Sequence, residues 1–137
     1  MTNKLTFKQA FLAGLTAAAV SSIINAILFF LFHSMGWITD DIFVQPNQPM
    51  NVILVIMASF VPSLIASLVF FAFEKYTQNG FRIFSTVTII LMLLSLAGPF
   101  TVIPNVTTPY ALSLSVMHLV VPLVLLYFIN RSKKANS

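Results

Sequence analysis

The chain has 137 residues, of which 58% are hydrophobic and only 7% are charged. Soluble domains carry about 25% charged residues, so seven Lys or Arg and three Asp or Glu cannot cover a water-facing surface of this size. Composition therefore excludes an ordinary soluble enzyme and a disordered chain, and it predicts an integral membrane protein. The chain has no cysteine, which excludes disulfides and thiolate metal sites. The bases behind the net charge of +4 are too few and too dispersed for a nucleic-acid groove, so no nucleic-acid partner is expected.

Four apolar segments reach the length of about 20 residues that a membrane-spanning helix needs. We expect helices approximately over residues 7–35, 51–73, 83–103 and 111–129. The stretches between them are short and rich in turn-forming residues, and they leave no room for an extramembrane domain. Because short loops place sequential helices side by side, the predicted fold is all-α. It is a single domain over residues 1–137, an antiparallel bundle of four transmembrane helices.

All seven basic residues fall on one side of this expected topology. They precede the first helix, lie between the second and third, or follow the fourth, as Lys4, Lys8, Lys75, Arg82, Arg131, Lys133 and Lys134. The other two loops contain no Lys or Arg. The positive-inside rule then places both termini in the cytoplasm. We expect the plasma (inner) membrane of a bacterium, with the lipid bilayer as the first partner.

The polar side chains inside the expected spans are neutral. All three carboxylates, Asp40, Asp41 and Glu74, are expected in loops, which argues against a coupled exporter that titrates an intramembrane carboxylate. From a rise of about 1.5 Å per residue, three polar residues share one layer of the outer leaflet, and a fourth lies near the middle of the membrane. The layer contains Ser59, Ser95 and His118, and the fourth residue is Asn25.

Three prolines fall close to this layer: Pro62, Pro99 and Pro122. A proline inside a helix leaves the carbonyl four residues earlier without its donor and kinks the helix. Such carbonyls must find other partners inside a membrane. Kinks beside polar side chains predict a small polar pocket that opens to the outside and binds or passes a small neutral or amphipathic ligand. Its expected ligand-binding residues are Asn25, Ser59, Ser95 and His118.

The same residues allow a second interpretation, in which the protein is a non-catalytic structural or accessory subunit of a membrane complex. Polar side chains in membrane helices commonly bond across helices and fix their packing. Small residues recur every fourth position in two stripes, Ala10, Gly14, Ala18, Ser22 and Ala26, and Ser59, Ser63 and Ser67. The stripes either join the first two helices or face a second subunit, so a homo-oligomer and a partner membrane subunit both stay open.

Motifs for catalysis and cofactors are missing. The chain has no nucleophile elbow, zinc-protease motif, phosphate loop or dinucleotide fingerprint, so we expect no enzyme and no cofactor. His33 and His118 differ in expected depth and have no carboxylate near them, which makes a poor metal pair, so no metal is expected. A redox subunit that uses His118 toward haem or quinone is a third, weaker alternative.

Short motifs give the chain a resemblance to known sequences. They are Asn25 in an apolar first helix, Ala58-Ser59 with Pro62-Ser63, Leu94-Ser95 with Pro99, and Met117-His118. With them the chain resembles an uncharacterised family of small four-helix bacterial membrane proteins, known only as a domain of unknown function. The resemblance spans nearly the whole chain. It implies a self-standing four-helix unit in a bacterial plasma membrane and supplies no activity.

Overall fold

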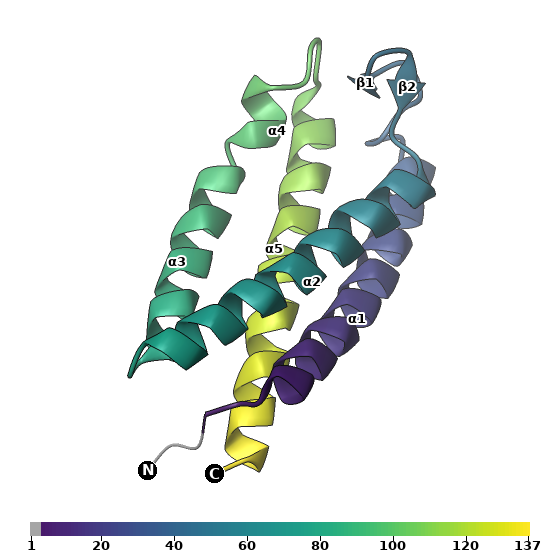
Figure 1. Cartoon of the computed structure of the whole chain (residues 1–137). Coiled ribbons are helices and arrows are strands. Elements are labelled where there is room, and N and C mark those ends of the chain that lie inside the picture. Colours follow the sequence, from purple (N-terminus) through teal and green to yellow (C-terminus); the bar gives the residue numbers. More distant parts are fainter. Residues whose placement is uncertain (1–3) are drawn as a thin grey trace.

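The computed structural model describes residues 4–137 and is mainly helical (Figure 1). Five helices and two short strands follow in the order α1 (Phe7–Ser34), β1 (Phe43–Gln45), β2 (Gln48–Pro49), α2 (Val52–Tyr76), α3 (Gly80–Ser95), α4 (Gly98–Thr101) and α5 (Thr108–Ala135). Within the described residues, four segments are long and apolar enough to cross a membrane, namely α1, α2, α3 together with α4, and α5. The expected all-α fold is confirmed, and these segments are consistent with a multi-pass membrane protein.

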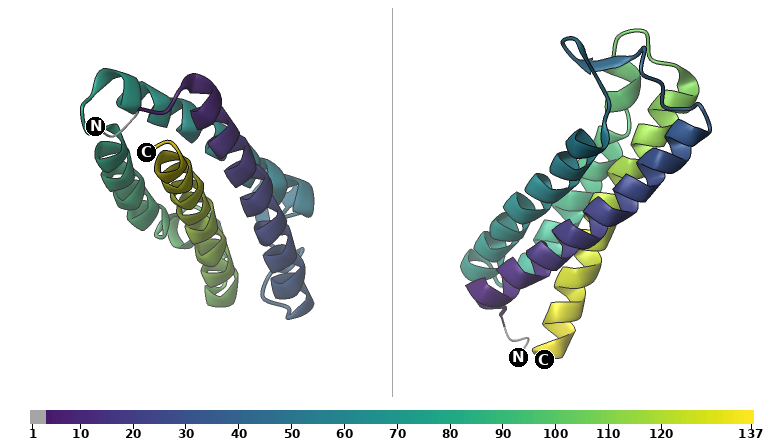
Figure 2. Two further views of the ribbon diagram at one scale, coloured as in Figure 1. Left: turned by 90° about the horizontal axis from the view of Figure 1, so that it is seen from below. Right: turned by 90° about the vertical axis from the view of Figure 1, so that its right-hand side faces the viewer.

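The long helices run alternately up and down, so both ends of the chain lie at the same end of the bundle (Figures 1 and 2). α1 packs mainly on α2 and α5, whereas α3 touches α2 and α5 more sparsely. α3 with α4 is accordingly the least buried of the four apolar segments. The helices are therefore tightly packed where α1 meets α2 and α5, and loosely packed along α3.

The interior has two apolar clusters with a polar zone between them. One cluster lies toward the chain termini and includes Phe70, Leu125 and Ile129, and the other lies toward the β-hairpin and includes Phe29 and Tyr110. Most of the buried polar side chains belong to the facing sides of α1 and α2, as Ser21, Ser22, Asn25, Ser59, Ser63 and Ser67. Small and polar residues thus bring these two backbones together, as expected in helix pairs that pack closely.

The two stripes of small residues face each other across the α1–α2 pair, so the alternative of a second subunit is not needed to explain them. Gly14 lies against Ser67, and the hydroxyl of Ser22 donates to the carbonyl oxygen of Ile56 over 3.4 Å. One turn further along α1, the Asn25 amide bonds to Ser59 of α2. The stripes therefore build the intramolecular seam.

The third apolar segment is broken, not kinked as expected for a helix over residues 83–103. α3 ends at Ser95, and Pro99 lies in the first turn of the separate short helix α4. Proline cannot donate to the carbonyl four residues before it, and Gly98 favours the helix weakly. The Ser115 hydroxyl of α5 bonds to the carbonyl of Ala111 in its own helix over 2.9 Å and also lies 3.4 Å from the carbonyl of Leu96, where the segment is broken.

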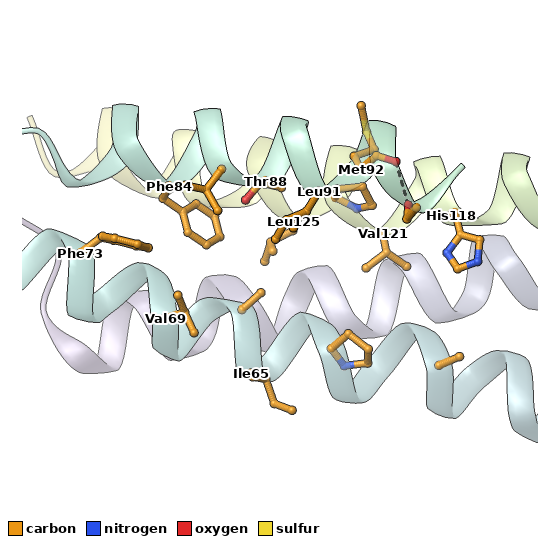
Figure 3. Close-up of a pocket in the computed structure, with 16 residues that line it drawn as sticks. Ile65, Val69, Phe73, Phe84, Thr88, Leu91, Met92, His118, Val121 and Leu125 are labelled. Carbon is orange, nitrogen blue, oxygen red and sulfur yellow. Dashed lines mark hydrogen bonds between the residues drawn. The ribbon is translucent and has the colours of Figure 1, made fainter. Parts of the chain in front are cut away.

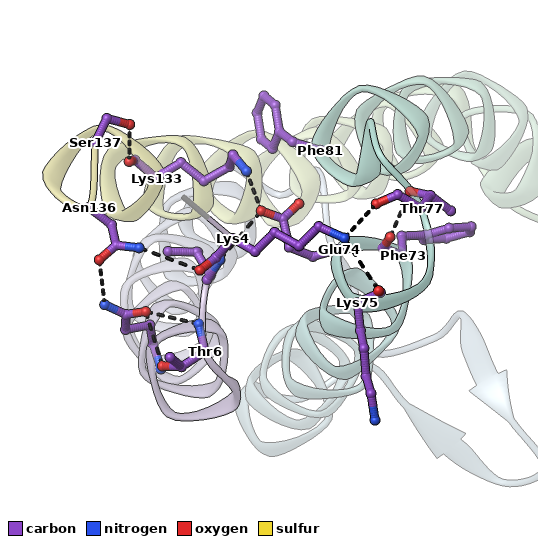
Figure 4. A network of polar contacts seen from close by, with 12 residues as sticks. Lys4, Thr6, Phe73, Glu74, Lys75, Thr77, Phe81, Lys133, Asn136 and Ser137 are labelled. Atoms are coloured by element: carbon purple, nitrogen blue, oxygen red, sulfur yellow. Dashed lines mark hydrogen bonds and ion pairs between the residues drawn. The ribbon is translucent and has the colours of Figure 1, made fainter. Parts of the chain in front are cut away.

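α2 is longer than expected and brings a carboxylate into the helix. The helix continues to Tyr76, so Glu74 lies in its last turns with only 3% of its surface exposed. The expectation that all carboxylates lie in loops is wrong for Glu74. Its carboxylate pairs with the ammonium group of Lys133 on α5 and accepts a bond from the Leu5 amide over 3.4 Å (Figure 4).

Further bonds join the same end of the bundle. The ammonium group of Lys4 donates to the carbonyl oxygens of Thr77 and Lys75 over 3.0 and 3.4 Å, which caps the end of α2 (Figure 4). The Gln9 amide donates to the side-chain oxygen of Asn136 over 3.0 Å. The start of the chain is thereby tied to the ends of both α2 and α5.

Candidate functional site

A small cavity of about 100 Å³ lies between α1, α2 and α5. Three of the four expected site residues, Asn25, Ser59 and His118, line it. The other lining residues are apolar and come from α2, α5 and the end of the hairpin loop, as Met50, Val55, Ala58, Leu114, Met117 and Val121. At about 30 Å³ for each water in the liquid, the cavity has room for a few waters or one compact chemical group.

Asn25 of α1 links the other two helices around this cavity, α2 and α5. Its side chain is 3% exposed, and its amide nitrogen donates to the Ser59 hydroxyl over 2.9 Å and to the Met117 carbonyl over 3.2 Å. A main-chain carbonyl only accepts, so the nitrogen and not the oxygen of the amide must face Met117. The Ser59 hydroxyl in turn donates to the carbonyl of Val55 over 2.8 Å. Both N–H groups of Asn25 and the proton of Ser59 are therefore used within the protein.

The side-chain oxygen of Asn25 is the one polar atom of this group that no bond within the described chain satisfies. It is buried and has no hydrogen-bond partner in the part of the chain that the structure describes. A buried acceptor without a partner costs about 1–3 kcal/mol, and such groups are normally satisfied by protein, water or a bound molecule. The oxygen belongs to a residue of the cavity wall, so the cavity is where a partner would come from.

A larger groove of about 540 Å³ runs along α2, α3 and α5 (Figure 3). Ligand sites for small molecules commonly measure about 300–1,000 Å³. None of the described residues that line the groove is Asp, Glu, Lys or Arg. Because α3 contacts its neighbours sparsely, the groove is open on the side of the bundle instead of being closed in its core.

The groove is polar at one end and apolar at the other (Figure 3). Ala58, Ser95 and His118 come from the end toward the hairpin, while Phe73 and Phe84 lie toward the chain termini. From Ala58 to Phe73 the groove follows α2 for roughly 22 Å at 1.5 Å per residue. This length and gradient match a molecule with one polar end and an extended apolar part.

His118 belongs to both spaces. It lines the small cavity and the groove, as do Ala58 and Val121, so the two spaces adjoin. Among the described residues its imidazole makes no hydrogen bond, and the side chain is exposed on the groove side. The expectation that His118 fixes the helix packing through an interhelical bond is therefore not met, whereas Asn25 does form such bonds.

The structure separates the expected polar layer into two parts. Ser95 and His118 line the groove, but Ser59 points toward α1 and shares the small cavity with Asn25. Pro62 and Pro122 line the groove beside them, inside α2 and α5. Pro99 lies in α4 and borders neither space.

Most of the groove lining was not predicted from the sequence, and two of these residues bear on the site. Thr88 lines the groove midway along α3, seven residues before Ser95. This spacing is two helical turns and places both on one face, which was the available signal. Ala58 was noted only beside its proline, yet it borders both spaces, and nothing in the sequence distinguishes it from the other alanines of the helices.

The remaining histidine lies elsewhere. The imidazole of His33 is at the exposed end of α1, 3.4 Å from the carboxylate of Asp40. Within the described residues, no group of three or more His, Asp or Glu side chains could hold a metal ion. The two histidines therefore belong to different places, as expected from their sequence positions.

Comparison with known proteins identifies the family. A model described as a family of unknown function, DUF6069, matches residues 6–135, and the chain belongs to this family. The resemblance to an uncharacterised family with a domain of unknown function is thus confirmed. No curated protein and no solved structure matches the chain. The family brings no activity to the site, so the function has to be argued from the geometry.

Proposed function

We propose that this member of DUF6069 is a multi-pass protein of the plasma membrane that binds or passes a small, neutral, amphipathic molecule in the groove between α2, α3 and α5. The observation behind the proposal is the gradient of the groove, with Ser95 and His118 at one end and Phe73 and Phe84 at the other. In this proposal both termini are cytoplasmic, so the polar end of the groove belongs to the outer half of the membrane.

The ligand is uncharged for two reasons. The described groove lining offers no ionic partner, and a charged group is costly at such depth in a membrane. His118 lies ten residues into α5, or roughly 15 Å from its outer end at 1.5 Å per residue. A compact neutral head can be held there by a few hydrogen bonds, while the apolar part follows Leu91, Leu125 and Phe73 along the groove.

Native mass spectrometry of the protein released gently from its own membrane tests this function. The expected result is a monomer or small homo-oligomer that retains a discrete additional mass. Ala58→Phe fills the junction of the groove and the small cavity and should abolish retention. Ala72→Phe makes the same change at an exposed position of α2 that borders neither space, and should leave retention unchanged. Retention of nothing, or equal retention in both variants, would contradict the proposal.

The second candidate is a structural or accessory subunit. The bonds from Asn25 to Ser59 and Met117 favour it, because they fix three helices without any ligand. His118→Ala separates the two functions. The imidazole has no hydrogen bond to lose within the described chain, so ligand binding should fall while thermal stability holds. A fall in stability with unchanged binding, or a second polypeptide in the mass spectrum, would favour the accessory subunit.

A further inference from the structure

The small cavity is marked by one buried acceptor without a partner among the described residues, the side-chain oxygen of Asn25, beside amide and hydroxyl donors that are already bonded. The two N–H groups of Asn25 and the hydroxyl of Ser59 are bonded within the protein. The side-chain oxygen of Asn25 remains buried and without a partner in the described part of the chain.

Two main-chain carbonyls next to the cavity lose their normal helical donors. Pro62 has no N–H for the carbonyl of Ala58, and Pro122 has none for the carbonyl of His118. Ala58 and His118 both line the cavity and the groove. In an apolar surrounding such carbonyls require another donor. At this junction the unpaired oxygen of Asn25 on α1 thus lies near two residues, on α2 and α5, whose carbonyls lack their usual helical donors.

We infer that this cavity receives the head of the groove's amphiphile and selects a head that donates hydrogen bonds without carrying a charge, as a hydroxyl group does. The inference rests on the proposed function and names the chemistry of its ligand. A head with only acceptors, such as an ether or a ketone, would leave the Asn25 oxygen unpaired. An ammonium head would bring donors as well, but no described residue that lines either space is Asp or Glu to neutralise it.

The size of the cavity agrees with this head. About 100 Å³ accommodates a hydroxyl and the first carbons of a chain, or a few waters at about 30 Å³ each. The shared residues Ala58, His118 and Val121 form the passage into the groove, which takes the apolar part. The imidazole of His118 can accept a bond from the head or donate one to it, depending on its tautomer.

Two probes that differ in one hydrogen-bond donor test the inference. We would compare 1-dodecanol with dodecyl methyl ether, added to the full-length protein in lipid nanodiscs, and express affinity per mole fraction in the bilayer. The chain contains only two histidines, so ¹⁵N-histidine labelling gives two imidazole reporters. His118 should respond to binding, and His33, at the exposed end of α1, serves as the internal control.

The expected result is that the alcohol binds about fivefold more tightly or better, because a buried acceptor left unpaired is costly. Equal affinity, or tighter binding of the ether, would overturn the inference and leave the groove function standing. If neither probe moved the His118 signal, both the inference and the groove function would fail.

Pro62→Ala adds a test from the side of the protein. It returns an N–H donor to the Ala58 carbonyl, so the preference for the alcohol should shrink. Pro109→Ala changes a proline in the first turn of α5, which borders neither space, and should leave the preference as in the wild type. If Pro62→Ala kept the full preference for the alcohol over the ether, the Ala58 carbonyl would not be one of the acceptors that bind the head.

Discussion

Gly14 of α1 lies directly against Ser67 of α2, and a β-carbon at position 14 would lie 2.2 Å from both the β-carbon and the hydroxyl oxygen of Ser67. Both atoms belong to a side chain that is itself fully buried. No larger residue fits there unless the two backbones separate. The closest approach of α1 and α2 thus depends on the missing side chain of Gly14.

Gly14→Ala should destabilise the protein, because the added methyl group overpacks this seam, at a cost of about 1–3 kcal/mol. Gly98→Ala is the matched control, since a β-carbon there meets no atom within 4 Å. Replacement of glycine by alanine in a helix otherwise stabilises by up to about 1 kcal/mol. Thermal unfolding in detergent, followed by circular dichroism, would measure both changes. Equal melting temperatures for the two variants would contradict the close contact.

Ser59→Ala should cost about 1–3 kcal/mol, because it leaves a buried N–H group of Asn25 without its acceptor. Ser85→Ala is the comparison, since the hydroxyl of Ser85 bonds only to the carbonyl of Phe81 in its own helix. That variant should change the unfolding free energy by no more than about 0.5 kcal/mol. Denaturant titration of the two variants side by side gives the difference. If both had the same small effect, Asn25 would not be the link between the helices.

Glu74→Ala should destabilise the end of the bundle where the termini lie, because Lys133 loses its partner at a site where its side chain is only 18% exposed. The cost should lie between the value of about 1 kcal/mol for a surface pair and about 3–5 kcal/mol for a buried one. Lys134→Ala, at the exposed neighbouring lysine, should be nearly neutral. Unfolding in detergent measures each.

A second change separates the charge of Lys133 from its packing. In Glu74→Ala with Lys133→Met, no ammonium group is left unpaired, so part of the lost stability should return. A double variant that is as unstable as the sum of the two single variants would mean that the pair contributes nothing.

The orientation of the chain can be tested by single cysteines, because the natural sequence contains none. We expect an impermeant maleimide to label Asp41→Cys, in the exposed loop before β1, in intact cells. Ser137→Cys, at the end with the basic residues, should react only after the cells are opened. The reverse pattern would overturn the assignment of cytoplasmic termini that the positive-inside rule gives.

The number and order of the apolar helical segments could be predicted from the sequence, but rotation about the helix axes could not. The length of the first apolar stretch predicted both ends of α1 to within one residue. These ends coincide with local signals, since Thr6 caps the start of the helix and Gly36, with a φ of +70°, follows its end. Ser59 and His118, which were expected at similar heights, both line the small cavity. Height alone could not show that Ser59 faces α1 while Ser95 faces the groove, since that depends on which helices pack together.

Two errors concern the ends of helical segments. A charged residue at the end of an apolar stretch was taken as the start of a loop, but Lys133 and the Leu5 amide stabilise Glu74 inside α2. Pro99 was expected to kink a continuous helix. The segment is interrupted before it, at Leu96 and Ala97, because Pro99 offers no N–H to the Ser95 carbonyl and Gly98 favours the helix weakly.

The position of Asn25 between α2 and α5 also bears on the order in which the chain assembles during synthesis. The seam between α1 and α2 needs only the first half of the polypeptide, so this hairpin can form while the ribosome is still translating. The Met117 acceptor for Asn25 and the Lys133 partner for Glu74 both arrive with the last helix. Until the last helix has been made, the nascent protein therefore holds an unfinished cavity and a carboxylate without its ammonium partner.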